Sequence, residues 1–226
     1  MSDEVEFVAS GDTLGRDVHT EHAIDAPVLG IPVRYESNSP TVIAIAESVF
    51  GQWRTLDRTP ELIASRSAQI RVMVVDGEEG HEEHAPFRYH VPDADRVIVT
   101  TRGSVGLADG RRREGVIYAT PALVRDREHF RYNMLEAVTL AVLSRQDRTP
   151  FHAAALMRGD TALLLAAPSG LGKSTLAYAG ARAGLKVLAE DLVFLQRRPL
   201  RVWGWPGALH LPADAAAHFP ELVASG

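Results

Sequence analysis

The sequence predicts an α/β fold in which a C-terminal α/β domain follows a smaller mixed α/β domain. Residues 161–167 form a short apolar run, which is typical of a buried parallel strand. A glycine-containing loop at residues 167–175 follows, and residues 173–183 have the composition of a helix. A second apolar run at residues 185–195 completes the order strand, helix, strand. Such a crossover makes the two strands parallel.

The N-terminal domain is expected over residues 1–149, and its sequence does not indicate a function. Strands are expected at residues 28–35, 69–75, 87–90 and 96–101, and a helix at residues 41–53. Residues 104–118 resemble a hairpin that turns at Asp109-Gly110. Residues 127–145 are expected to form a helix, because Phe130, Met134, Val138, Ala141 and Val142 recur at helical spacing.

The C-terminal domain, residues 150–226, is expected to open with a β-hairpin. Two apolar runs, at residues 151–157 and 161–167, are joined by Arg158-Gly159-Asp160. Pairing about Gly159 sets Met157 opposite Thr161 and therefore His152 opposite Ala166. This register predicts that His152 lies at the entrance of the glycine-containing loop.

The loop itself matches the phosphate-binding pattern Gly-x-x-x-x-Gly-Lys-Ser/Thr except at the first position, which is Ala167. Gly170 and Gly172 let the backbone turn its N–H groups inward to cradle a phosphate. Lys173 would reach the outer phosphate oxygens, and the Ser174 hydroxyl would contact Mg²⁺. Lys173 is one of only two lysines in the chain, which makes a chance match improbable. The phosphate-binding residues are therefore expected to be Ser169, Gly170, Leu171, Gly172, Lys173, Ser174 and Thr175.

An acidic pair, Glu190-Asp191, interrupts the apolar run that follows the loop helix. Ligands of open α/β sheets sit beyond the carboxyl ends of the strands, so the pair is expected to face the same pocket as Lys173. One carboxylate would hold Mg²⁺ and the other would accept the proton of an attacking hydroxyl, while His152 would tune the basicity of a carboxylate. We expect Ser174 and Asp191 as Mg²⁺ ligands, although neighbouring strand residues point to opposite faces and the sequence alone does not separate the two roles.

Composition excludes several other classes of protein. The formal net charge is −5 and no long basic tract is present, so nucleic acid is not an expected partner. No apolar run has the length of a membrane span, and the acidic N-terminus does not resemble a signal peptide. The chain has no cysteine, which excludes disulfides and thiolate metal sites. These features together predict a cytoplasmic protein.

Three motifs in this order resemble the C-terminal catalytic domain of the HPr serine kinase/phosphorylase family, and more closely the HPr-kinase-related proteins that lack the N-terminal domain of the true enzyme. The motifs are Phe-His-Ala-Ala-Ala-Leu from residue 151, the phosphate-binding loop, and Leu-Ala-Glu-Asp-Leu-Val-Phe-Leu from residue 188. The resemblance covers roughly residues 130–212. It implies a P-loop kinase domain with a mixed sheet and flanking helices.

The resemblance also implies a function. The expected catalytic residues are His152, Lys173, Glu190 and Asp191, and the expected cofactors are ATP, or a related phosphate donor, and Mg²⁺. The implied reaction is phosphorylation of a seryl hydroxyl on a protein or peptide. Homo-oligomers occur in the family, so self-association is an expectation here.

The chain departs from the family pattern in ways that leave alternatives open. The acidic pair is usually Asp-Asp and begins here with Glu190, and Thr175 replaces an acidic residue. The chain ends soon after Asp191, so part of the substrate site is expected to be absent or supplied by another subunit. The alternatives are a nucleotide-binding module without transfer activity and a small-molecule kinase. The acceptor, whether protein, modified peptide or metabolite, stays open.

Overall fold

The structure, a computed structural model, describes residues 20–55, 66–75, 86–168, 170–207, 209–211, 215 and 219. The chain divides into two units, Met1–Leu143 and Ser144–Gly226, and this division falls a few residues before the expected boundary. Each unit is described below by itself. In the described residues, no helix combines the length and the apolar character needed to cross a membrane.

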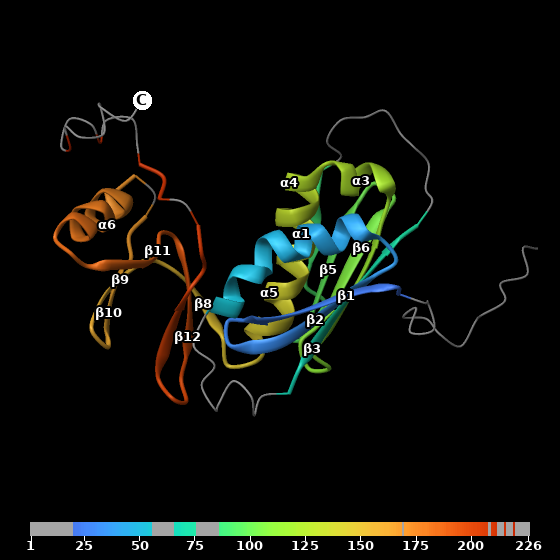
Figure 1. Ribbon diagram of the computed structural model, residues 1–226, viewed down its shortest axis with the longest axis horizontal. Coiled ribbons are helices and arrows are strands. Elements are labelled where there is room, and N and C mark those ends of the chain that lie inside the picture. The colour runs from blue at the N-terminus through green and yellow to red at the C-terminus, as the bar shows by residue number, and fades with distance from the viewer. Residues whose placement is uncertain are drawn as a thin grey trace, which may run out of the picture. The chain divides into compact units, whose positions relative to one another are not determined.

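The first unit contains a mixed seven-stranded sheet with the order β1-β2-β3-β7-β6-β5-β4 (Figure 1). Its strands are β1 (His22–Val28), β2 (Ile31–Ser37), β3 (Ala68–Val74), β4 (Arg88–His90), β5 (Arg96–Thr101), β6 (Ser104–Asp109) and β7 (Glu114–Ala119). The pairs β2–β3 and β3–β7 are parallel, and every other neighbouring pair is antiparallel. The protein is therefore of mixed α/β class, as expected, but this unit holds the largest described sheet and is not the smaller domain.

Helices cover one face of this sheet. They are α1 (Pro40–Phe50), the 3₁₀ helix η1 (Gly51–Thr55), α3 (Pro121–Arg125), α4 (Arg127–Phe130), the π-helical segment η2 (Arg131–Glu136) and α5 (Ala137–Ser144). Buried Tyr35 of β2 links two of them, since its ring stacks on Phe50 and its hydroxyl lies 3.5 Å from the Thr139 hydroxyl. Burial raises the pKa of the Tyr35 hydroxyl well above its usual value.

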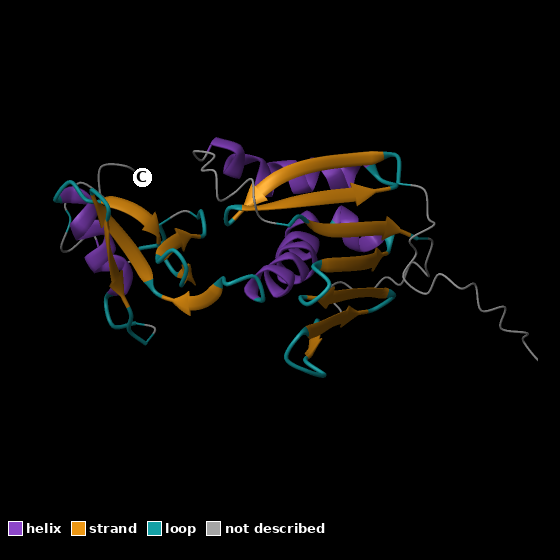
Figure 2. Ribbon diagram, turned by 90° about the horizontal axis from the view of Figure 1, so that it is seen from below, coloured by secondary structure: helices purple, strands orange, loops and turns teal. Residues whose placement is uncertain are grey.

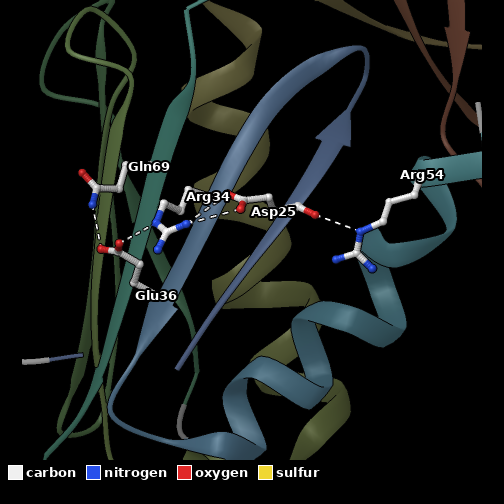
Figure 3. Close-up of polar contacts among 5 residues, drawn as sticks. All are labelled: Asp25, Arg34, Glu36, Arg54 and Gln69. Carbon is white, nitrogen blue, oxygen red and sulfur yellow. Dashed lines mark hydrogen bonds and ion pairs between the residues drawn. The ribbon is translucent and has the colours of Figure 1, made fainter. Parts of the chain in front are cut away.

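The opposite face of the sheet carries a charged network near its β1–β2 edge (Figure 3). Arg34 lies between two acids, with Nε donating to Glu36 Oε1 at 2.7 Å and Nη1 donating to Asp25 Oδ2 at 3.3 Å. Gln69 Nε2 also donates to Glu36, and Arg54 Nε donates to the Asp25 backbone carbonyl. One sheet face is thus packed against helices and the other is polar at this edge, as alternation along strands requires.

Two sequence expectations for the first unit changed in detail. The strand expected at residues 28–35 is two strands joined by a turn at Leu29-Gly30, where Gly30 N–H donates to the Pro27 carbonyl. The turn consists of Leu29, which is fully buried, and Gly30. It contains none of the polar residues that mark most turns in a sequence. The hairpin at residues 104–118 is confirmed, but Asp109 pairs with Glu114 and the turn is formed by residues 110–113 rather than by Asp109-Gly110. The helical stretch 127–145 is confirmed as consecutive α, π and α segments that end at Ser144.

The described part of the second unit has two three-stranded sheets and the helix α6 (Lys173–Arg182) (Figures 1 and 2). One sheet has the order β10-β9-β11, and the other has the order β13-β12-β8. Their strands are β8 (Thr149–His152), β9 (Ala154–Arg158), β10 (Thr161–Leu165), β11 (Lys186–Ala189), β12 (Leu192–Gln196) and β13 (Arg201–Gly204). Because β9 is antiparallel to both neighbours, β10 and β11 run parallel to each other with β9 between them.

The expected hairpin of the second unit is confirmed, but its register is wrong by one residue. Met157 pairs with Ala162 rather than with Thr161, because only Gly159 and Asp160 form the turn. The expected first strand also breaks at Ala153. His152 therefore belongs to β8 and pairs with Leu192 of β12, not with Ala166.

Two small apolar clusters hold the layers of the second unit together. Between the two sheets lie Ala153, Ala155, Ala189 and Val193, with Leu164, Leu188 and Val202 packed against them. Between the first sheet and α6 lie Ala154, Leu156 and Ala177, with Leu165, Leu185 and Leu209. Small side chains in both clusters let the layers approach closely.

Candidate functional site

The loop that matches the phosphate-binding pattern lies between the end of β10 and the start of α6, as the sequence predicts. Gly170 and Gly172 have φ values of +83° and +80°, in the left-handed region that favours glycine. No heavy atom lies within 4 Å of a Cβ built on either residue. Glycine is therefore required here for its backbone conformation and not for space. Ser169 of the expected loop lies outside the described residues.

The N-terminus of α6 is suited to an anion. Gly172 is the N-cap, so no side chain caps the first turn, and the first turn contains no acidic residue. The first N–H groups of a helix have no partner within the helix and carry the positive end of the helix dipole. Lys173 and Ser174 are the first two residues of this helix, so both belong to its first turn.

The ammonium of Lys173 contacts two of the predicted catalytic residues. Its Nζ donates to Asp191 Oδ1 at 2.5 Å and lies 2.8 Å from His152 Nε2. His152 Nδ1 lies 3.3 Å from Asp191 Oδ2, which closes a ring of three side chains. An ammonium only donates, so Nε2 accepts and Nδ1 carries the proton that points at Asp191. Lys173 is 8% exposed, whereas the side chains of His152 and Asp191 are 59% exposed.

Glu190 makes a separate set of contacts beside this ring. Its Oε1 accepts a hydrogen bond from the Ser174 hydroxyl at 3.0 Å, and its Oε2 lies 3.0 Å from His210 Nδ1. The carboxylate is 12% exposed and His210 is strongly exposed. Each carboxylate oxygen of Glu190 therefore has a polar neighbour that fixes its position. The Ser174 hydroxyl donates its proton to one of them.

Glu190 and Asp191 both reach the loop because they form the short connection in which the chain leaves the sheet of β11 and enters the sheet of β12. Strand β11 ends at Ala189 and β12 begins at Leu192, so Glu190 and Asp191 lie in a bend and do not alternate between opposite faces. The chain makes a matching change of sheet at Ala153, whose N–H donates to the Asp191 carbonyl at 3.0 Å. This bond holds the residue before it, His152, next to Asp191.

Most of the predicted site residues therefore come together. His152, Lys173 and Asp191 are in mutual contact, and Ser174 contacts Glu190. Asp191 bonds the lysine and Glu190 bonds the serine, and the assignment of Ser174 and Asp191 as metal ligands stays a prediction. Leu171 is exposed in the loop, and Thr175 lies in the first turn of α6.

His210 contacts the candidate-site residue Glu190, and no sequence pattern marks it. It follows a proline- and glycine-containing stretch without apolar periodicity, and it is separated from Glu190 by twenty positions. Only the fold shows that it lies against Glu190. We find no feature of the sequence around His210 that would have identified it.

The side chains present fit Mg²⁺ in their chemistry. Mg²⁺ prefers oxygen ligands, keeps several waters and is usually held by one or two carboxylates together with substrate phosphates. The Ser174 hydroxyl and the Glu190 carboxylate are adjacent oxygen donors at the helix N-terminus. The described residues include no group of three or more acidic or histidine side chains placed to hold a metal ion.

Comparison of the chain with protein-family models and with curated proteins found no match.

Proposed function

We propose that the second unit is a P-loop phosphotransferase of the HPr-kinase-related type, which transfers the γ-phosphoryl group of ATP to a hydroxyl of a protein or peptide. The observation that carries the proposal is the contact of Lys173 with both His152 and Asp191 at the start of α6. A glycine loop alone would be consistent with many roles. A phosphate loop whose lysine touches a carboxylate–imidazole pair has both an anion site and a base.

The loop would bind and orient the phosphate donor. The N–H groups at Gly172 and in the first turn of α6 would hold phosphate oxygens, with Lys173 as the positive charge beside them. Because the Lys173 ammonium has three donors, it can bond a phosphate oxygen while it keeps its contacts with Asp191 and His152. Bound Mg²⁺ would supply charge neutralisation at the phosphates, and Ser174 and Glu190 are the residues that would hold it.

Asp191 and His152 would act on the acceptor. In the transfer, the acceptor oxygen forms a bond to the γ-phosphorus, the bond from that phosphorus to the bridging oxygen breaks, and ADP leaves. The acceptor proton goes to the Asp191 carboxylate, which is exposed and therefore reachable by a substrate. His152, through its Nδ1 proton, would orient that carboxylate.

The two lysines of the chain provide the test. The Lys173→Met variant should lose transfer of labelled γ-phosphate to peptide mixtures by at least about a hundredfold, because the anion site loses the positive charge of Lys173. Lys186→Met, which removes an exposed lysine of β11, should leave the rate unchanged. Transfer that survives Lys173→Met would overturn the proposal. Binding of ATP that depends on Lys173, without transfer to any peptide or small alcohol, would indicate a nucleotide-binding module instead.

A further inference from the structure

We propose that the acceptor is an acidic peptide segment that binds in extended form along the exposed edge strand β8, with its acidic side chains against Arg197 and Arg198. This inference rests on the proposed function. It adds a substrate class and a docking surface to the phosphate site. All residues that carry it belong to the second unit.

Strand β8 is an edge strand that leads directly into the catalytic residues. It is the outer member of the sheet β13-β12-β8, and all four of its residues, from Thr149 to His152, are exposed. Its last residue is His152, whose imidazole contacts Lys173 and Asp191. A peptide that paired with β8 would therefore place one of its residues at the base.

The free edge of β8 offers backbone groups for such pairing. Ala153 N–H donates to the Asp191 carbonyl, so by the alternation of an antiparallel ladder the backbone of Phe151 also faces β12. The N–H and carbonyl of His152 and the carbonyl of Pro150 then face away from β12. Pro150 has no N–H group, but an N–H at this position would point away from β12 and would bond no described strand. Proline in a sheet is usually found at such edge positions. Strand addition to such an edge is a common mode of peptide binding.

The other end of β8 lies beside a basic surface. The turn after β12 carries Arg197 and Arg198, both exposed, and Arg197 N–H, Arg197 Nε and Arg198 N–H all donate to the Asp147 carboxylate at 3.2 Å. Although desolvation opposes it, these bonds lower the pKa of Asp147, which therefore stays ionised and holds the turn in place. Asp147, Arg197 and Arg198 line a hollow of about 350 Å³.

Arg198 is the arginine best placed to bind an external anion. Arg197 already pairs with Asp147, whereas the Arg198 guanidinium has no acidic partner among the described residues. A third arginine, Arg148, is buried under this surface with its guanidinium 5.1 Å from the centre of the Trp203 ring. Burial lowers its pKa to about 10, so it still adds positive charge at neutral pH.

Charge complementarity selects an acidic partner. Basic residues outnumber acidic ones in Ser144–Gly226, although the whole chain has a formal net charge of −5. The exposed Leu200, beside the two arginines, adds an apolar contact that suits a peptide side chain better than a phosphate backbone. A peptide rather than a nucleic acid is the occupant that these features favour together.

The length of β12 sets the spacing within the peptide. Asp191 precedes β12 and Arg197 follows it, so five strand residues separate them. At about 3.3 Å per residue, the two ends of the site are roughly 15–20 Å apart. An extended peptide should therefore carry its acidic residues about five positions from the hydroxyl residue.

The test uses fluorescent peptides of about twelve residues with a central serine and three glutamates about five positions away on either side. Their binding to the full chain is measured by anisotropy without nucleotide, and their phosphorylation is measured separately. Replacement of the glutamates by glutamine should weaken binding about tenfold, as should Arg198→Glu in the protein. The matched control is Arg158→Glu, which reverses an exposed charge at the β9–β10 turn and should change binding less than twofold.

N-methylation of successive peptide amides tests the strand geometry. Addition to an edge predicts loss of binding at alternate positions, because only every second amide faces β8. Equal binding of glutamate and glutamine peptides, equal effects of Arg158→Glu and Arg198→Glu, uniform tolerance of N-methylation, or tighter binding of a short RNA would each overturn the inference. Phosphorylation without acidic preference would overturn docking and leave the proposed function standing. Docking of the acidic peptide without transfer of phosphate would overturn the proposed function and leave the docking surface standing.

Discussion

The backbone N–H of Ala153 donates a hydrogen bond to the carbonyl of Asp191 at 3.0 Å. Each residue lies where the chain leaves one three-stranded sheet of the second unit and enters the other. The bond therefore joins the two crossing points and sets His152 beside Asp191. Lys173, from the start of α6, completes the group. The candidate site is thus a consequence of where the strands end.

Gly172→Ala should weaken ATP binding by at least about tenfold. A side chain at φ +80° costs about 1–2 kcal/mol, which the loop can relieve by turning its N–H groups away from the phosphate. The control is Gly184→Ala, because Gly184 follows the same helix at φ +86° and also has open space at its Cβ position. Isothermal titration with ATP and Mg²⁺ distinguishes the two variants. Equal loss of affinity in both would mean that backbone strain, not loop geometry, is responsible.

The two acids should separate into different roles. Asp191→Asn should lower the rate of transfer by about a hundredfold or more with ATP affinity nearly unchanged, because an amide cannot accept the acceptor proton. Glu190→Gln should instead raise the Mg²⁺ concentration needed for half-maximal activity, since Glu190 contacts Ser174. Mg²⁺ titrations of steady-state rates provide the measurement. The reverse pattern would exchange the assigned roles.

Gly204→Ala should destabilise the second unit by about 2–3 kcal/mol. A Cβ on Gly204 would lie well inside van der Waals contact of the Leu188 carbonyl oxygen, a backbone atom that cannot rotate away. Gly207→Ala, three residues on, meets nothing within 4 Å and should be nearly neutral. Hydrogen exchange of peptides from β11, β12 and β13 reports the effect on this unit. Equal protection in both variants would contradict the packing described here.

Glu36→Gln should destabilise the first unit at neutral pH by about 1 kcal/mol, and the difference should shrink in acid. Desolvation raises the pKa of Glu36, but hydrogen bonds from Arg34 and Gln69 and the nearby charges of Arg34 and Arg71 outweigh it, so its pKa is lowered below 4.5. A lowered folded-state pKa stabilises the fold above the unfolded value and loses that contribution as pH falls through the folded value.

Denaturation of wild type and the Gln variant at pH 7, 5, 4 and 3 gives the required comparison. The difference in unfolding free energy should be constant down to about pH 5 and decrease below pH 4.5. Circular dichroism of the full chain follows the loss of structure. A difference that stays constant to pH 3 would show that Glu36 acts through packing and not through its charge.

Much of the candidate site could be predicted from local sequence. The loop, the helix after it and the left-handed glycines depend on a few neighbouring residues, so a motif of fixed spacing identifies them. The hairpin at Gly159 was equally local, although its register was wrong by one residue. The buried turn at Leu29-Gly30 was missed because its residues are apolar, and turn chemistry in sequence relies on polar side chains.

The sequence by itself identified the loop that matches the phosphate-binding pattern and the candidate residues His152, Glu190 and Asp191, because residue type and spacing along the chain specify them. Only the tertiary structure decided that Asp191 bonds Lys173, that Glu190 bonds Ser174, and that His210 joins them. The physical reason is that strand breaks redirect side chains. Whether a strand continues or changes sheets is decided by packing between the layers, and no local pattern of residues records that choice.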